Sequence, residues 1–167
     1  MDAAGQRLHS WRTLILPYLD QAPLYAQIDL SKPWDDPVNA TVCKTALPVY
    51  HCPASDSPSN QTSYLVVSAP NSCFPDAGCT KLKEVLDSTA NTLMVIEADA
   101  GHAVPWMAPT DLDLASLLKL EPNSELAHSS GMTGLFADGS VRFLSASMSQ
   151  GVRRAMVSIA GNDDSAE

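Results

Sequence analysis

Two short apolar runs near the C-terminus carry the clearest local pattern in the chain. Met132–Phe136 and Val141–Leu144 are rich in apolar, β-branched and aromatic residues, and Ala-Asp-Gly-Ser separates them. Such runs on either side of an Asp-Gly pair are typical of a β-hairpin. We expect Asp138 and Gly139 to form a two-residue turn in which both have positive φ, a conformation that glycine adopts freely and aspartate tolerates. His128 then lies on the approach to the first strand.

Similar patterns predict the other elements of the fold. Further strands are expected at Val49–His51, Thr62–Ser68 and Thr92–Glu97. Helical spacing of apolar positions predicts helices over Ser10–Leu19 with Ser10 as the N-cap, Asp36–Leu47 with Pro37 in the first turn, Asp111–Leu120, and Gln150–Ile159. Segments rich in Ser, Pro, Asn and Gly over Pro53–Gln61 and Ala69–Thr80 predict loops.

These elements predict an α+β fold. We expect a small, largely antiparallel sheet with flanking short helices and long loop insertions. No internal repeat or change in composition divides the chain, so residues 1–167 are expected to form a single domain, and the polar, acidic segment 162–167 a frayed tail.

The charge of the chain excludes one class of partner. The formal net charge is −9, and the sequence has only ten Lys and Arg residues. Proteins that bind phosphate backbones rely on clustered cations, so we expect no nucleic-acid partner.

Several segments resemble one bacterial family in the family's own order. His128 is separated by nine residues from Asp138-Gly139, and this spacing is similar to the H-X9-DG signature of a family of prepilin-like proteins, DUF1559, that is typical of planctomycetes. The resemblance extends through most of the sequence, from residue 9 to residue 160. Its other segments are Ser10–Gln21, Leu24-Tyr25, Pro33–Pro37, Tyr50–Pro53, Asn91–Glu97 and Val104–Trp106.

The resemblance implies a non-enzymatic role in the cell envelope. Family members resemble type IV prepilins and type II secretion pseudopilins, so the expected protein is a pilin-like head at the periplasmic or extracellular face. Its expected partners are other pilin-like subunits or secretion components, or a second copy of the chain. The alternative is a module that binds an extracellular glycan or protein. His128, Asp138 and Gly139 are expected to shape the terminal hairpin and to carry no catalytic role.

The anchor helix of such proteins has no counterpart in this sequence. No window approaches the roughly 18 apolar residues of a membrane span, and no basic start precedes an apolar stretch. We therefore expect membrane attachment only through an N-terminal helix absent from this sequence, and the alternative is a member of the family that never had such a helix. In the pilin-like architecture that helix packs on the sheet. Without it, we expect the final helix or a second copy of the domain to cover the apolar sheet face.

The four cysteines relate to the cellular compartment of the protein, because disulfides form outside the cytoplasm. Cys43 and Cys52 bracket one loop-like segment, and Cys73 and Cys79 bracket another. Neither spacing matches a structural zinc site. The extracytoplasmic location that the resemblance implies favours disulfides within these two local pairs, Cys73 with Cys79 above all, and the alternative is four free thiols.

Candidate metal or proton-transfer chemistry centres on a carboxylate, an imidazole and a second carboxylate. Glu97, His128 and Asp138 form this set, and Asp99 follows Glu97 closely. Each also has a structural interpretation: Asp138 in the turn, His128 bonded to the hairpin, and Glu97 and Asp99 solvated at a strand end. The structural interpretation is favoured for all of them.

Calcium is the metal that the acidic loops would favour, because hard cations prefer carboxylate and carbonyl oxygens. The sequence does not choose among the acidic segments, and no EF-hand spacing is present. The contributors considered are Asp35-Asp36, Asp87 with Asn91, Glu97 with Asp99, and Asp111 with Asp113. Trp34 and Trp106 are candidates for a binding surface, with core packing as the alternative. The sequence contains no GxSxG motif, so it gives no indication of a hydrolase.

Overall fold

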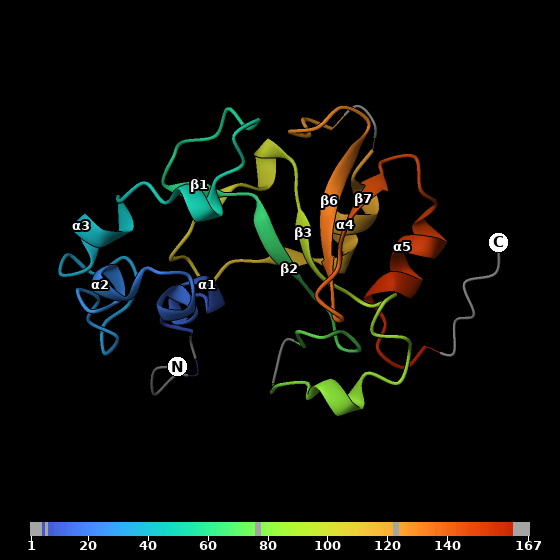
Figure 1. The fold of residues 1–167 in the computed structure, drawn as a ribbon, viewed down its shortest axis with the longest axis horizontal. Coiled ribbons are helices and arrows are strands. Elements are labelled where there is room, and N and C mark those ends of the chain that lie inside the picture. The colour runs from blue at the N-terminus through green and yellow to red at the C-terminus, as the bar shows by residue number, and fades with distance from the viewer. Residues whose placement is uncertain (1–4, 6, 76–77, 122–123, 162–167) are drawn as a thin grey trace. The chain divides into compact units, whose positions relative to one another are not determined.

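The computed structural model describes residues 5, 7–75, 78–121 and 124–161, so the predicted tail at 162–167 lies outside the described residues. The chain forms two compact units. The first consists of Met1–Thr62 with Ala103–Thr110, and the second of Ser63–His102 with Asp111–Glu167. Figure 1 colours the ribbon from blue at the N-terminus to red at the C-terminus and labels most of the helices and strands.

The first unit is built from short helical turns and one small ladder. Its helices are α1 (Trp11–Leu14), α2 (Ala22–Tyr25) and α3 (Ala40–Cys43), with 3-10 turns η1 (Leu16–Tyr18) and η2 (Pro48–Tyr50). Strands β1 (Gln61–Thr62) and β4 (Val104–Pro105) pair antiparallel. Ser10 is the N-cap of α1, as predicted: its hydroxyl accepts a hydrogen bond from the Thr13 backbone N–H at 3.2 Å.

The core of the first unit forms around Trp106. The indole is fully buried, stacks on Tyr50 with 6.3 Å between ring centroids, and donates a hydrogen bond to the Thr45 carbonyl at 3.1 Å. Arg12 is also fully buried, and its guanidinium donates to the carbonyls of Trp106, Ala108 and Thr110. Other buried members of this core are Leu16, Ile28, Val42, Leu47 and Met107.

Three predicted elements of the first unit are shorter or of another type. The helix expected over Asp36–Leu47 is reduced to α3, because the buried Asn39 side chain bonds the backbone of Asp29 and Pro33 and fixes a turn there. The strand expected at Val49–His51 is the 3-10 turn η2, which begins at a proline. The helix expected over Ser10–Leu19 divides into α1 and η1.

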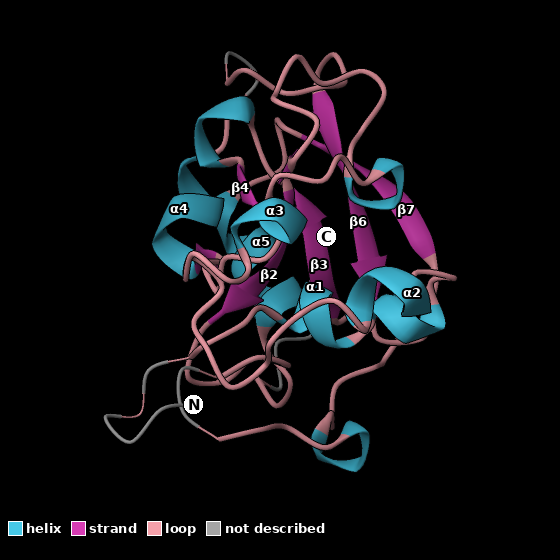
Figure 2. Ribbon diagram, turned by 90° about the vertical axis from the view of Figure 1, so that its left-hand side faces the viewer, coloured by secondary structure: helices cyan, strands magenta, loops and turns pink. Residues whose placement is uncertain are grey.

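The second unit contains a five-stranded sheet. Its strands are β2 (Tyr64–Ser68), β3 (Leu93–Glu97), β5 (Leu112–Asp113), β6 (Gly131–Phe136) and β7 (Val141–Ser145). Their order is β5-β2-β3-β6-β7, and all pairs are antiparallel except the short β2–β5 pair. Figure 2 shows β2, β3, β6 and β7 as neighbouring strands. The remaining 3-10 turns are η3 (Leu82–Glu84) and η4 (Ala100–His102). The predicted α+β class is thus confirmed.

Two helices pack on one face of this sheet. They are α4 (Leu114–Lys119), capped by Asp113, and α5 (Gln150–Val157), capped by Ser149. Side chains from the strands and both helices line a small apolar cavity: Leu93, Ile96, Met132 and Leu144 from the sheet, Leu117 from α4, and Met156 from α5. The final helix therefore covers one face of the sheet.

The opposite face of the sheet retains exposed apolar side chains. Neighbouring residues of a strand point to opposite faces, and directly paired residues share one. Val141 pairs with Leu135 and Phe143 pairs with Thr133, so these four lie on the face away from Leu144 and Met132. Val141 and Phe143 are 62% and 60% exposed. β7 is also an edge strand of the sheet.

The turn of the terminal hairpin differs from the prediction. Gly139 has φ +85°, as expected, but Asp138 does not have positive φ. The Gly139 N–H donates to the Phe136 carbonyl, and the Phe136 N–H donates to the Ser140 carbonyl. This pattern is a type I turn followed by a left-handed glycine, which requires positive φ at one residue only. Within the described residues, no helix combines the length and apolarity needed to cross a membrane.

Candidate functional site

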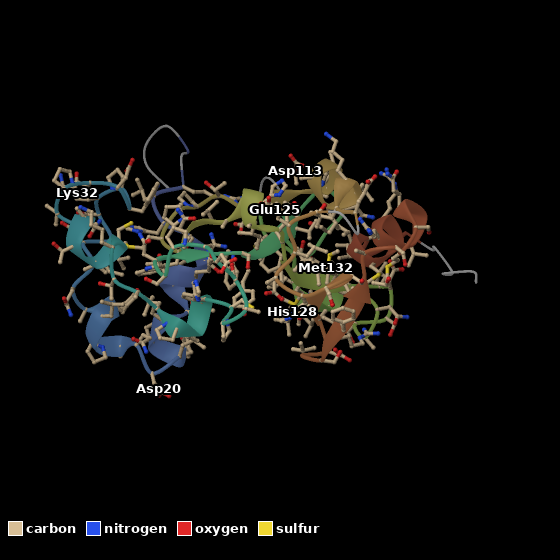
Figure 3. The ribbon with its side chains drawn as sticks, turned by 90° about the horizontal axis from the view of Figure 1, so that it is seen from above. Asp20, Lys32, Asp113, Glu125, His128 and Met132 are labelled. Carbon is tan, nitrogen blue, oxygen red and sulfur yellow. The ribbon has the colours of Figure 1, made fainter. Side chains whose placement is uncertain are left out.

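The second unit brings a buried carboxylate and an imidazole together. Glu97 ends β3 and is 3% exposed. Its Oε2 lies 3.3 Å from Nε2 of His128, whose side chain is 41% exposed. His128, labelled in Figure 3, precedes β6. It forms a backbone bridge with Gly131, the first residue of that strand. The antiparallel pairing of β3 with β6 brings the end of β3 close to the start of β6, which His128 precedes.

One oxygen of this carboxylate is unsatisfied. Among the described residues, Oε1 of Glu97 is buried and has no hydrogen-bond partner. Leaving a buried acceptor unpaired costs about 1 to 3 kcal/mol, and more for a charged group. The expectation that Glu97 is solvated at a strand end is therefore wrong, because the carboxylate is enclosed within the fold.

Asp138 lies away from this pair. His128 stands before β6 and Asp138 after it, so a strand rising about 3.3 Å per residue separates them by roughly 20 Å. Asp138 Oδ1 accepts hydrogen bonds from the Ser140 hydroxyl at 2.6 Å and its backbone N–H at 2.8 Å. These bonds lower the pKa of the Asp138 carboxyl. The predicted role of Asp138 and Gly139 in shaping the hairpin fits this turn, and the three-residue constellation does not form.

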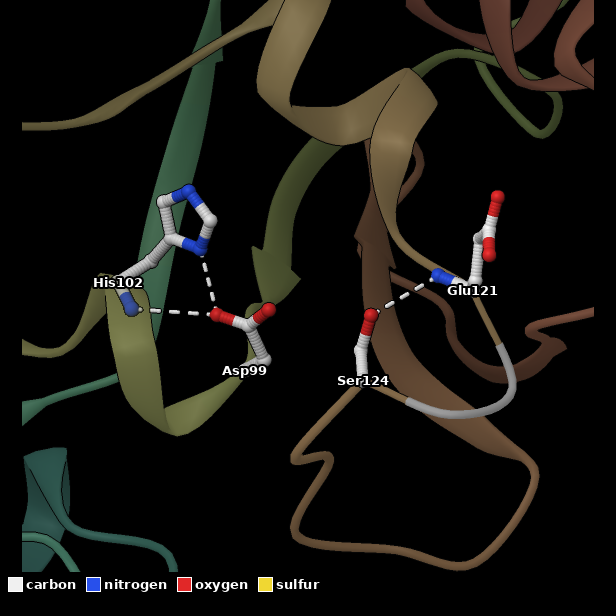
Figure 4. Close-up of polar contacts among 4 residues, drawn as sticks. All are labelled: Asp99, His102, Glu121 and Ser124. Atoms are coloured by element: carbon white, nitrogen blue, oxygen red, sulfur yellow. Dashed lines mark hydrogen bonds and ion pairs between the residues drawn. The ribbon is translucent and has the colours of Figure 1, made fainter.

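Asp99 belongs to a different contact (Figure 4). Its Oδ1 accepts from the His102 backbone N–H at 3.1 Å and lies 2.5 Å from His102 Nδ1. Both bonds close the 3-10 turn η4, so this carboxylate already has local partners. Figure 4 also shows the Glu121 N–H donating to the Ser124 hydroxyl at 3.0 Å, a second local loop contact.

The acidic loops considered for calcium are used in backbone contacts. Asp111 accepts from the Val66 N–H, Asp113 from the Ser116 N–H and Asp36 from the Val38 N–H. Asp87 likewise accepts from the Gly161 N–H. In the part of the chain that the structure describes, no three Asp and Glu side chains gather as a calcium site would require. Calcium therefore remains a sequence prediction without a site.

The structure contains no disulfide among its four cysteines, so the predicted local pairings are not formed in it. Cys52 is buried, whereas Cys43 at the end of α3 is half-buried. In the second unit Cys73 is half-buried and Cys79 is exposed. Burial raises the pKa of the Cys43 and Cys73 thiols, which disfavours their reactive thiolate forms.

The two tryptophans do not form an exposed surface together. Trp106 is fully buried in the first unit, so core packing is the correct interpretation. Trp34 is half-buried and packs against the same core. Sequence analysis missed two exposed aromatic side chains, Tyr18 in the first unit and Phe143 in β7. Phe143 is the one that lies on the sheet. The sequence pattern of β7 could have indicated it. Val141, Phe143 and Leu144 are apolar, so both faces of the strand are apolar, although only one face packs on helices.

The comparisons with known proteins identify the family. The family model described as a protein of unknown function, DUF1559, matches residues 1–124. The chain therefore belongs to the DUF1559 family. The matched region ends before His128, so it does not include the H-X9-DG spacing. No curated protein and no solved structure shows significant similarity to the chain.

Proposed function

We propose that the chain is the head of a non-enzymatic, pseudopilin-like subunit at the periplasmic or extracellular face of the cell envelope. Its work would be assembly with other pilin-like subunits of a type II secretion or type IV pilus-like system. Membership of the DUF1559 family and the prepilin-like order of the sequence segments support this proposal. The single structural observation that carries it is the apolar face of β7.

That face has the properties of a packing surface. Val141 and Phe143 are 62% and 60% exposed and point in the same direction. Their paired neighbours Leu135 and Thr133 are half-buried, so the apolar area continues from β7 onto β6. Contiguous exposed apolar area of this kind marks interaction sites more often than isolated apolar residues do. The opposite face already packs on α5, and this face has no such cover from α5.

An apolar helix is the partner that this surface fits best. A sheet face buries its apolar side chains against a helix or a second sheet, and pilin-like subunits contribute a long apolar helix to their assemblies. The other polar clusters near the hairpin have local structural roles. Asp138 closes the turn and Asp99 closes η4, which is consistent with a protein that works through its surfaces.

Charge substitutions on this face test the proposal. Phe143→Asp and, separately, Val141→Asp would be introduced into the full-length protein in its native bacterium. Leu86→Asp is the matched control, because Leu86 is 78% exposed in the same unit and lies outside the sheet. Envelope fractions would be solubilised mildly and the protein's sedimentation measured.

The wild type and Leu86→Asp are expected to sediment with the envelope assembly, and the two β7 variants as free subunits. Circular dichroism of the purified variants would verify folding. Equal sedimentation of all variants, or recovery of the wild type outside the envelope, would contradict the proposal. A wild type that remains a free subunit and binds a soluble glycan would instead favour the binding-module alternative.

A further inference from the structure

The polar group that the proposed function leaves unexplained is the Glu97 carboxylate. Glu97 is next to Ile96, which faces α5, so its side chain points to the opposite face of the sheet. It is 3% exposed, and its Oε1 has no hydrogen-bond partner among the described residues. An enclosed carboxylate with an unused oxygen calls for a positive ligand or a strong donor.

The second group at this position is an imidazole with metal-ligand geometry. Zinc holds histidine nitrogens and carboxylate oxygens at about 2.0 to 2.2 Å, so two ligands at the tetrahedral angle lie about 3.3 Å apart. The observed separation between Glu97 Oε2 and His128 Nε2 is 3.3 Å. The two atoms are thus placed as neighbouring ligands of one ion would be.

We propose that Glu97 and His128 form part of a binding site for a divalent transition metal of the zinc class, with water or another donor completing the coordination. Imidazole and carboxylate together suit this class better than calcium, which prefers oxygen ligands alone. A metal-bound water is a hydrogen-bond donor, and one beside Oε1 would satisfy that oxygen. The 41% exposure of the His128 side chain leaves a route by which the ion can enter from solvent.

The other imidazole–carboxylate pair in this unit provides the matched control. His102 and Asp99 also pair at short distance, but Asp99 Oδ1 is already shared between the His102 ring and its backbone N–H. That pair closes a local turn. Removal of His102 therefore deletes a comparable imidazole without touching the proposed ligands.

The test is zinc binding by the purified full chain after removal of metals with a chelator. Isothermal titration with Zn²⁺ would be compared among wild type, Glu97→Gln, His128→Ala and His102→Ala, with Ca²⁺ as the competing ion. The proposal predicts a stoichiometric site in the wild type and in His102→Ala. It predicts a loss of affinity of more than about tenfold in the other two variants, and no competition from Ca²⁺. Titration with Co²⁺ would report the ligand geometry by visible absorption.

Several results would overturn the site. They are the absence of stoichiometric Zn²⁺ binding to the wild type, equal affinity in all variants as expected for adventitious binding to cysteine thiols, or competition by Ca²⁺ at equal concentration. If Glu97→Gln fails to fold, His128→Ala carries the test, because His128 is partly exposed and less embedded. The site is independent of the assembly role, so either proposal can fail without the other.

Discussion

The guanidinium of Arg153 in α5 donates a hydrogen bond of 3.1 Å to the carbonyl of Leu117 in α4. It also donates to the carbonyls of Leu120, beyond the end of α4, and Ala146, after β7. Arg153 is 6% exposed, and burial lowers its pKa. One side chain thus joins both helices to the end of the hairpin and satisfies carbonyls that a helix end leaves without intrahelical partners.

Replacement of Arg153 should be among the most destabilising changes in the second unit. Arg153→Ala leaves three buried carbonyls without this donor, and we expect a loss of about 3 kcal/mol in the free energy of unfolding. Arg154→Ala, one position along α5 and exposed, should change it by less than about 0.5 kcal/mol. Urea unfolding followed by circular dichroism measures both values. Equal effects of the two substitutions would refute the bridging role.

Tyr50 should make the stability of the first unit depend on pH at the alkaline end. Its buried hydroxyl donates to the Arg12 carbonyl at 2.7 Å, and burial raises the pKa of the phenol well above its usual value. In the unfolded chain a tyrosine loses its proton near pH 10. The stabilisation from the protonated form is therefore complete below about pH 10 and is lost as pH rises above it.

The comparison of wild type with Tyr50→Phe isolates this effect. The variant lacks the hydrogen bond and should be less stable by about 1 kcal/mol at pH 8. The difference should shrink above pH 10, because only the wild type carries the group that must stay protonated. Unfolding free energies measured in denaturant from pH 8 to pH 11 show whether it does. A difference that stays constant across this range would argue against a buried, protonated Tyr50.

Asn39 should tolerate even a conservative change poorly. It is fully buried, its amide nitrogen donates to the carbonyls of Asp29 and Pro33, and its oxygen accepts from the Asp29 N–H. Asn39→Asp keeps the shape but turns the donor into a charged acceptor that faces two carbonyls. We expect a loss of about 3 kcal/mol, measured by thermal unfolding at neutral pH. A stability within about 0.5 kcal/mol of the wild type would show that these bonds do not hold the loop.

The left-handed conformation of Gly139 predicts that substitutions at this position differ in how much they destabilise the hairpin. Its φ is +85°, so Gly139→Val should destabilise the hairpin by roughly 1 to 2 kcal/mol, whereas Gly139→Asn should cost less because asparagine tolerates this region. A Cβ at this position meets no atom within 4 Å, so backbone conformation alone sets the difference. Melting temperatures of the two variants give the order, and the reverse order would exclude a left-handed turn.

The sequence predicted those elements whose cause is local. The terminal hairpin, the Ser10 cap and α5 each follow from residues within a few positions of one another. The helix predicted over Asp36–Leu47 was wrong because the Asn39 side chain bonds the backbone of Asp29. The spacing of apolar residues gives no information about such a contact. The same limit applied at the site. Glu97 and His128 were both singled out, but only the pairing of β3 with β6 shows that they meet and that Asp138 does not.

Site-specific photocrosslinking tests the assembly surface most directly. Phe143 of the full-length protein would be replaced by p-benzoylphenylalanine in its native bacterium, with Leu86 replaced in a parallel strain, because both side chains are exposed and apolar. We expect irradiation to join position 143, and not position 86, to the apolar N-terminal helix of a pilin-like subunit, as identified by mass spectrometry of the crosslinked peptide. The absence of any crosslink specific to position 143, or crosslinks to peptides unrelated to such a helix, would contradict it.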